Sequence, residues 1–118
     1  MTVFTEGRHA AEFILSEANG QRSRDNGTVA GGQDLAAGTV LAKPAGDELV
    51  AWTATEFTDG VEDEPVGVLI YPTDTTDGAL AAAYIARDAE VNVNLLTFPE
   101  GQQAYTVSML KKLGIVAR

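Results

Sequence analysis

The sequence predicts a small, mainly β domain that ends in one helix. The chain has 118 residues, which is enough for one compact domain and too few for two. Turn signals such as Asn19-Gly20, Gly31-Gly32 and Asp77-Gly78 recur at short intervals along it. The segments between them are short and rich in β-branched or alternating residues, which is typical of an all-β barrel or sandwich-like domain.

Six internal segments are expected to form the strands. They are Glu12–Ser16, Gly38–Lys43, Leu49–Thr53, Val66–Tyr71, Leu80–Ala86 and Glu90–Leu96. The stretch 53–65 is acidic and rich in turn residues, so we expect it to be a loop. No repeat or long linker divides the chain.

One helix is expected between Gly101 and Leu113. Apolar side chains recur along it at helical spacing: Tyr105, Val107, Met109, Leu110 and Leu113. Such a stripe is typical of a face packed on the core, and we interpret it so rather than as a cofactor site. Gly114 supplies the left-handed residue that ends the helix, and Ile115 is then expected to fold back onto Leu110. Ile115-Val116 begins a short final strand.

The composition excludes several classes of function. Cysteine is absent, which removes disulfides, thiolate metal sites and cysteine nucleophiles, and the single histidine, His9, excludes a His-rich metal cage. Residues 25–110 hold fourteen acids against Lys43 and Arg87, a sum of −12, so phosphate backbones would repel the chain and we expect no nucleic-acid partner. No apolar run approaches the ~20 residues of a membrane span, and the first ten residues lack a signal-peptide pattern.

The first ten residues differ from the rest. Thr2-Val3-Phe4-Thr5 has high strand propensity, and Glu6-Gly7-Arg8-His9 then breaks the pattern. The segment is either a frayed terminus, which is the common case, or an arm that pairs with the sheet edge of another chain. The residues alone leave both interpretations open.

The sharpest enzyme-like pattern is Thr73-Asp74-Thr75-Thr76 after an apolar strand. Retropepsin-type aspartic proteases, which are dimers of chains this long, present Asp-Thr-Gly in such a place and pair two carboxylates that share one proton. Here Thr76 stands where glycine is required and Pro72 interrupts the approach. We therefore favour a polar turn whose Asp and Thr side chains bond to the local backbone. A dimeric protease using Asp74 is the alternative.

Two further binding functions were weighed on the residues. The acidic run Asp59–Glu64 lacks the alternating oxygen ligands of a calcium loop, so we interpret it as a solvated loop. A carbohydrate- or receptor-binding tail module would use an exposed Trp52 or Tyr71, although buried aromatic residues are commoner. No catalytic residues, metal site, cofactor or small-molecule substrate are expected.

Several local strings occur together and in order. They are the SxxxGxxSR pattern from Ser16 to Arg24, AAGTVL at 36–41, VGVL at 66–69 and LGIVAR at 113–118. In this order and at this length the chain resembles the bacteriophage lambda head decoration protein D family, from about Glu12 to Arg118. The resemblance implies a small β-clip, or tulip-like, domain over residues 12–118, preceded by a flexible arm over residues 1–11.

The resemblance also implies a function. Members of that family form trimers on the outer surface of the expanded phage head, having been made in the host cytoplasm, and they cement neighbouring major capsid proteins against the pressure of packaged DNA. The family's arm joins a strand of the major capsid protein. The matching capsid-binding positions here are Thr2, Val3, Phe4, Thr5, Glu6, Gly7, Arg8 and His9. A structural role of this kind requires no enzyme activity, and the arm is shorter than that of the lambda member.

Overall fold

Five strands close into a barrel. In order around it they are β2 (Arg24–Val29), β5 (Glu48–Ala51), β4 (Val40–Ala42), β6 (Pro65–Leu69) and β8 (Leu80–Ile85). The computed structural model describes residues 11–43, 48–53 and 65–118. Neighbouring barrel strands are antiparallel except β2 and β5, which are parallel.

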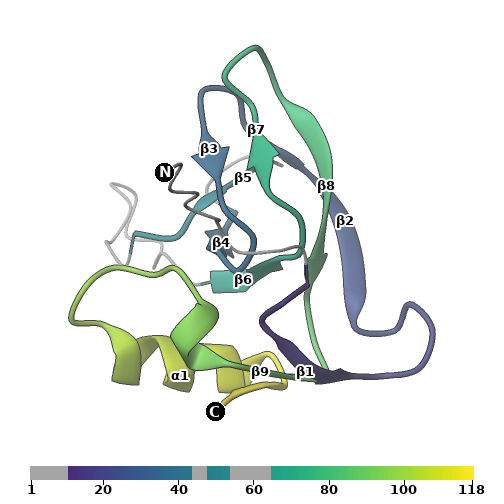
Figure 1. The fold of residues 1–118 in the computed structure, drawn as a ribbon, viewed down its shortest axis with the longest axis vertical. Helices are drawn as coiled ribbons and strands as arrows, with labels where there is room; N and C mark the ends of the chain where they lie inside the picture. The colour runs from purple at the N-terminus through teal and green to yellow at the C-terminus, as the bar shows by residue number, and fades with distance from the viewer. Residues whose placement is uncertain (1–10, 44–47, 54–64) are drawn as a thin grey trace, which may run out of the picture.

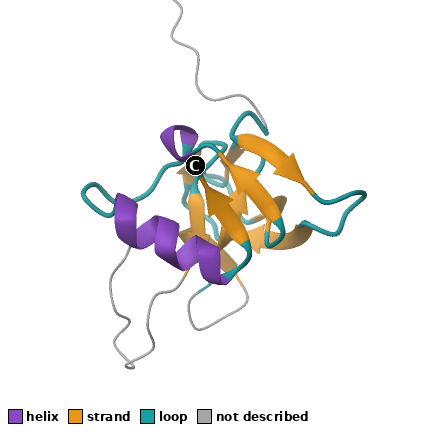
Figure 2. Cartoon of the chain, turned by 90° about the horizontal axis from the view of Figure 1, so that it is seen from below, coloured by secondary structure: helices purple, strands orange, loops and turns teal. Residues whose placement is uncertain are grey.

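Two smaller sheets flank the barrel. At one end, β1 (Ile14–Glu17), β9 (Ala89–Val91) and β10 (Ile115–Ala117) form a three-stranded sheet beside the helix α1 (Gln103–Lys112). At the other end, β3 (Asp34–Leu35) and β7 (Thr73–Asp74) form a two-stranded ribbon. Figure 1 shows the ribbon and the first half of β8 rising away from the barrel, with α1 and the three-stranded sheet at the opposite end. Figure 2 views the molecule from this second end.

The core has two parts that share the barrel wall. Alternate residues of a strand point to opposite faces, so Leu41 and Leu69 enter one cluster and their neighbours Val40 and Val68 enter the other. The first cluster fills the barrel and draws on every barrel strand: Val29, Leu41, Leu49, Leu69 and Tyr84. The second lies between the barrel and the α1 end, where Phe13, Ile85, Leu110 and Ile115 are almost fully buried.

The predicted fold class is confirmed, together with most of its elements. Five expected strands are found within a few residues of their predicted bounds, at β1, β4, β5, β6 and β8. The helix and the final strand are also found. Gly114 has φ +82°, as the predicted helix ending requires, and its N–H donates to the Lys111 carbonyl at 3.0 Å. Ile115 and Leu110 share the second core cluster.

The strand β2 was missed by sequence reasoning. Residues 24–29 read RDNGTV, and the pair Asn26-Gly27 within them is typical of a turn rather than of a strand. Gly27 serves packing instead: a Cβ there would lie 2.8 Å from the Leu49 Cδ1 atom inside the barrel. The glycine therefore makes room for the Leu49 side chain in the barrel and does not form a turn.

Two other expectations need correction. The segment expected as a strand over Glu90–Leu96 is a strand only to Val91, because the Asn92 side chain accepts a hydrogen bond from the Asn94 N–H and caps a short 3₁₀ helix, η1 (Val93–Leu95). The apolar stripe of α1 is only partly a core face. Met109 and Leu110 are buried, whereas Tyr105 is 43% exposed.

The buried polar residue of α1 was not foreseen. Thr106 is fully buried, and its hydroxyl donates to the Gln102 carbonyl at 2.7 Å. Because the hydroxyl is satisfied within the helix, a threonine can occupy the core side of α1.

Candidate functional site

The described chain begins where the predicted arm joins the body. Ala11 has φ +60°, and its N–H donates to the Ile70 carbonyl at 2.9 Å. Its own carbonyl accepts from the Ile14 N–H at 3.1 Å, which leads the chain into β1. The candidate capsid-binding residues lie outside the described residues: Thr2, Val3, Phe4, Thr5, Glu6, Gly7, Arg8 and His9.

A groove of about 340 Å³ lies between β7 and the first half of β8, and its lining includes Tyr71, the residue after Ile70. Its apolar rim is exposed, since Tyr71 is 49% and Leu80 50% accessible. The lining residues are Asn26, Tyr71, Pro72, Thr73, Asp74, Leu80, Ala81, Ala82 and Ala83. Sequence reasoning did not identify this groove, although the run of small residues Ala81–Ala83 before the buried Tyr84 was a signal for it.

The Asp74 side chain bonds within its own loop. Its Oδ1 atom accepts from the Thr76 N–H at 3.0 Å and from the Thr76 hydroxyl. These two bonds, the hydroxyl first, lower the pKa of the exposed Asp74 carboxyl. The local bonding we predicted is therefore confirmed, although Thr73 and Asp74 themselves form β7 rather than a turn. A protease dyad needs a carboxyl that shares a proton, and these contacts instead favour the ionised form.

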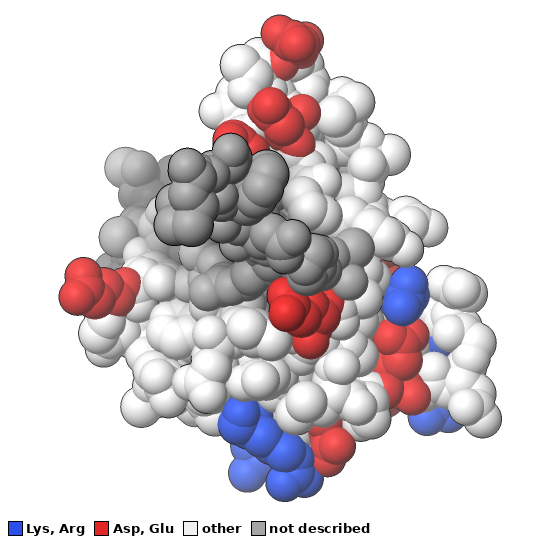
Figure 3. Space-filling model, in the orientation of Figure 1, with Lys and Arg blue, Asp and Glu red and all other residues white. Residues whose placement is uncertain are grey.

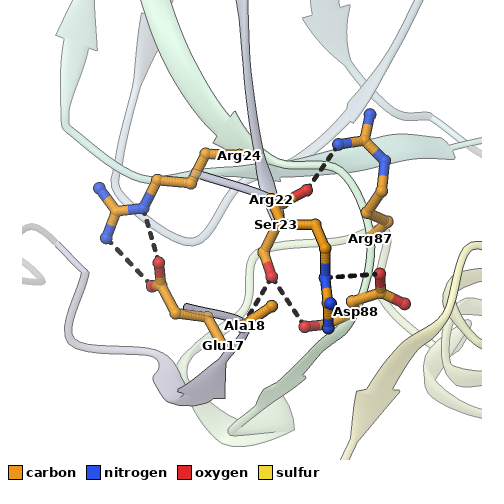
Figure 4. Close-up of polar contacts among 7 residues, drawn as sticks. All are labelled: Glu17, Ala18, Arg22, Ser23, Arg24, Arg87 and Asp88. Atoms are coloured by element: carbon orange, nitrogen blue, oxygen red, sulfur yellow. Dashed lines mark hydrogen bonds and ion pairs between the residues drawn. The ribbon is translucent and has the colours of Figure 1, made fainter. Parts of the chain in front are cut away.

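Residues of the SxxxGxxSR pattern make polar contacts that join β1, β2 and the turn after β8 (Figure 4). Ser23 is fully buried; its hydroxyl accepts from the Ala18 N–H at 2.9 Å and donates to the Asp88 carbonyl at 2.8 Å. Arg24 makes a two-pronged ion pair with Glu17 at 2.9 and 3.0 Å. The Ser23–Asp88 contact joins residues that are 65 positions apart, whereas the other contacts join β1 to β2 locally.

Two glycines in the quoted strings are fixed by close backbone approaches. A Cβ at Gly38, where φ is +89°, would lie 2.4 Å from the Leu95 carbonyl oxygen. A Cβ at Gly67 would lie 2.2 Å from the Ile85 carbonyl oxygen. Neither distance is compatible with a side chain, so both positions require glycine.

The last string ends in an ion pair. Arg118, which directly follows β10, contacts the Glu90 carboxylate of β9 at 2.8 Å, and the Ser16 hydroxyl of β1 donates to the same carboxylate at 3.0 Å. The Arg118 hydrogen bond, with Ser16 second, lowers the pKa of Glu90. One carboxylate thus joins all three strands of this sheet. The residues that carry the resemblance hold the fold together rather than form a reaction centre.

Charge is distributed unevenly over the described surface. The ribbon and the turn after it carry Asp34, Asp74 and Asp77, whereas the end of α1 and of β10 carry Lys111, Lys112 and Arg118. Figure 3 shows acidic side chains at the ribbon end and a basic group at the opposite end. The ribbon end of the described molecule is therefore acidic, and the end with α1 and β10 carries the basic group.

Of the two aromatic residues considered for sugar binding, only one is exposed. Trp52 is 3% exposed and stacks on Tyr105 with ring centroids 5.8 Å apart, so it cannot serve as an exposed sugar platform; Tyr71 is exposed. The acidic run Asp59–Glu64 lies outside the described residues. Within residues 11–43, 48–53 and 65–118 there is no cluster of three acidic or histidine side chains that could hold a metal ion. In the same ranges no helix is long and apolar enough to cross a membrane.

Comparison with known proteins identifies the family. The family model of bacteriophage lambda head decoration protein D matches residues 3–115, which is nearly the whole chain and includes most of the predicted arm. No curated protein gave a match. With all four strings in the same β domain, the chain belongs to the family of bacteriophage lambda head decoration protein D, a family of structural proteins that decorate the phage capsid.

Proposed function

We propose that this decoration protein binds the outside of the expanded phage head as a homotrimer and stabilises it against the pressure of packaged DNA. The observation that carries the proposal is the extent of the family match, which begins at Val3 and so includes the arm as well as the body. Its partner is the major capsid protein.

The arm residues Thr2 to His9 supply the contact by adding a strand to a sheet of the capsid protein. Thr2–Thr5 has the β propensity that strand addition requires, and main-chain hydrogen bonds then give affinity while a pocket for Phe4 gives specificity. Three arms on one trimer raise the effective concentration of each, so individually weak strand additions become tight binding.

The test is deletion of residues 2–10. The hydrogen bond from the Ala11 N–H to the Ile70 carbonyl does not involve residues 2–10. The truncated protein should therefore keep its thermal midpoint and its oligomeric mass. Binding to expanded capsids, measured by co-sedimentation, should be lost. Phe4→Ala should weaken binding more than the control Thr2→Ala. Full-affinity binding by the truncated protein would refute the proposal that the arm binds the capsid.

The oligomeric state is tested separately. Light scattering of the free protein at micromolar concentration should give about three times the chain mass of 12.4 kDa. A monomer in solution and on the capsid would refute the trimer.

A further inference from the structure

The turn between β1 and β2 contains the pair Asn19-Gly20, and both residues are exposed. Gly20 has φ +70°, and a Cβ atom there would have no neighbour within 4 Å, so open space surrounds this part of the turn. The Gly20 N–H donates no hydrogen bond to any other described residue. Because no contact in the described chain holds this amide, it is free to approach the side chain that precedes it.

Asparagine is a chemically labile residue, and a glycine after it opens a route by which its side-chain nitrogen is lost without an enzyme. The Gly20 nitrogen gives up its proton to solvent and bonds to the Asn19 Cγ atom, since glycine has no Cβ to obstruct the approach. The Cγ–Nδ2 bond then breaks, and the side-chain nitrogen takes up a proton and leaves as ammonia. Water opens the resulting cyclic imide at either carbonyl, which leaves aspartate or isoaspartate at position 19.

The second Asn-Gly pair of the sequence has the same chemistry in a different environment. Asn26 and Gly27 lie inside β2, opposite Ala83 and Ala82 of β8. Gly27 is also packed against Leu49, whose Cδ1 atom would lie 2.8 Å from an added Cβ. Closing the imide ring requires the backbone at Asn26 to rotate out of its extended conformation. That rotation separates β2 from β8, so the reaction is slowed by the free energy of opening the barrel wall.

We propose that Asn19 is a site of spontaneous deamidation in the folded protein, whereas Asn26 is protected by its strand. In the isoaspartate product the main chain runs through the former side chain, which lengthens the turn by one carbon. The ends of this turn are joined by the hydrogen bond from the Ala18 N–H to the Ser23 hydroxyl at 2.9 Å (Figure 4). The isoaspartate form should therefore lose this contact between the end of β1 and the start of β2. The modification requires neither the arm nor a capsid, so it is tested on the free protein.

Both pairs are followed in one experiment. Trypsin cleaves after Arg22 and Arg24, which places Asn19 and Asn26 in different peptides. The folded protein is kept in mildly alkaline buffer, which favours loss of the amide proton, and the peptides are then analysed by mass spectrometry. Asn19 should be converted at least about tenfold faster than Asn26, because the central residues of a paired strand open rarely. Equal rates, or faster conversion of Asn26, would overturn the proposal.

The unfolded chain is the matched control, because unfolding removes the structural difference between the two pairs. In guanidinium chloride Asn19 and Asn26 should be converted at similar rates, since each is followed by glycine. A rate difference that persisted unchanged in the denaturant would assign the selectivity to the neighbouring residues instead of the fold, and would overturn the protection of Asn26 by β2.

A variant tests the consequence for the turn. Asn19→Asp carries the charge of the product but keeps the normal main chain, and at an exposed position it should melt close to the wild type. The isoaspartate form, isolated by chromatography from the incubated protein, should melt at a lower temperature than this variant. Equal melting temperatures for the two would overturn the link between deamidation and the Ala18–Ser23 contact.

Discussion

The buried hydroxyl of Ser23 donates to the backbone carbonyl of Asp88 at 2.8 Å, which ties the start of β2 to the turn between β8 and β9. The same oxygen accepts from the Ala18 N–H, so one small side chain satisfies two backbone groups. The contact explains why a serine precedes the arginine of β2, and it makes Ser23 a sensitive position.

Ser23→Ala should lower the free energy of unfolding by about 1–3 kcal/mol, because it leaves a backbone donor and a backbone acceptor without a partner in a buried site. Urea denaturation followed by circular dichroism measures the change. Ser108→Ala, at an exposed helix position, should change stability by less than about 0.5 kcal/mol. A loss of similar size in both variants would contradict the stabilising role of the two Ser23 hydrogen bonds.

Leu110→Ala should cost about 2–5 kcal/mol, because Leu110 is fully buried in the cluster between α1 and the barrel. Tyr105→Ala should cost clearly less, since Tyr105 is 43% exposed, but it should change the fluorescence of Trp52, on which its ring stacks. Thermal and urea denaturation compare the two. A larger loss for Tyr105→Ala would show that the stacked pair, rather than the leucine, anchors the helix.

Gly67→Ala should severely destabilise the protein, because its Cβ would overlap the Ile85 carbonyl oxygen at 2.2 Å and separate β6 from β8. Gly31→Ala is the control: its Cβ would have no neighbour closer than 3.5 Å. Soluble yield and melting temperature report the difference. If Gly67→Ala melted like Gly31→Ala, the close packing of these strands would be wrong.

Stability should depend on pH through Glu90. Arg118 and Ser16 lower its pKa in the folded state relative to the unfolded chain, so their stabilising contribution is present above the ordinary value of 4.5 and is lost as pH falls through the folded pKa. Melting temperature measured from pH 6 downward should therefore fall less steeply in Arg118→Gln than in the wild type. Lys112→Gln, which removes an exposed charge in the last turn of α1, should retain the wild-type slope. Parallel curves for all three proteins would contradict a role for Glu90.

The sequence predicted an element correctly where its residue pattern is typical of only one structure. Strands with apolar alternation and the helix with Gly114 at its end were found close to their predicted positions because periodicity and the helix ending agree there. Gly27 misled the prediction because glycine serves two purposes, and its packing against Leu49 depends on a contact 22 positions away. Residue patterns carry no information about such a contact.

The candidate site divides in the same way. The local bonding of Asp74 follows from neighbouring residues, so it could be predicted. The arm stays a prediction, because residues 1–10 lie outside the described residues. The groove could not be predicted from the sequence. It forms where β7 turns away from β8 and pairs with β3, and this pairing joins residues that are far apart in the chain. The buried role of Ser23 likewise depends on a partner 65 positions away.

The attachment of Ala11 to Ile70 has a mechanical consequence. Tension applied to the proposed capsid-binding arm by a pressurised shell would first reach this hydrogen bond, and Ile70 in turn is bonded to Ala83 of β8. The force would thus enter the barrel wall, where several strands share it, instead of peeling β1 from the edge of its sheet. A pull on one end of the chain becomes a load that β8 shares with its neighbours β2 and β6 through their ladder hydrogen bonds.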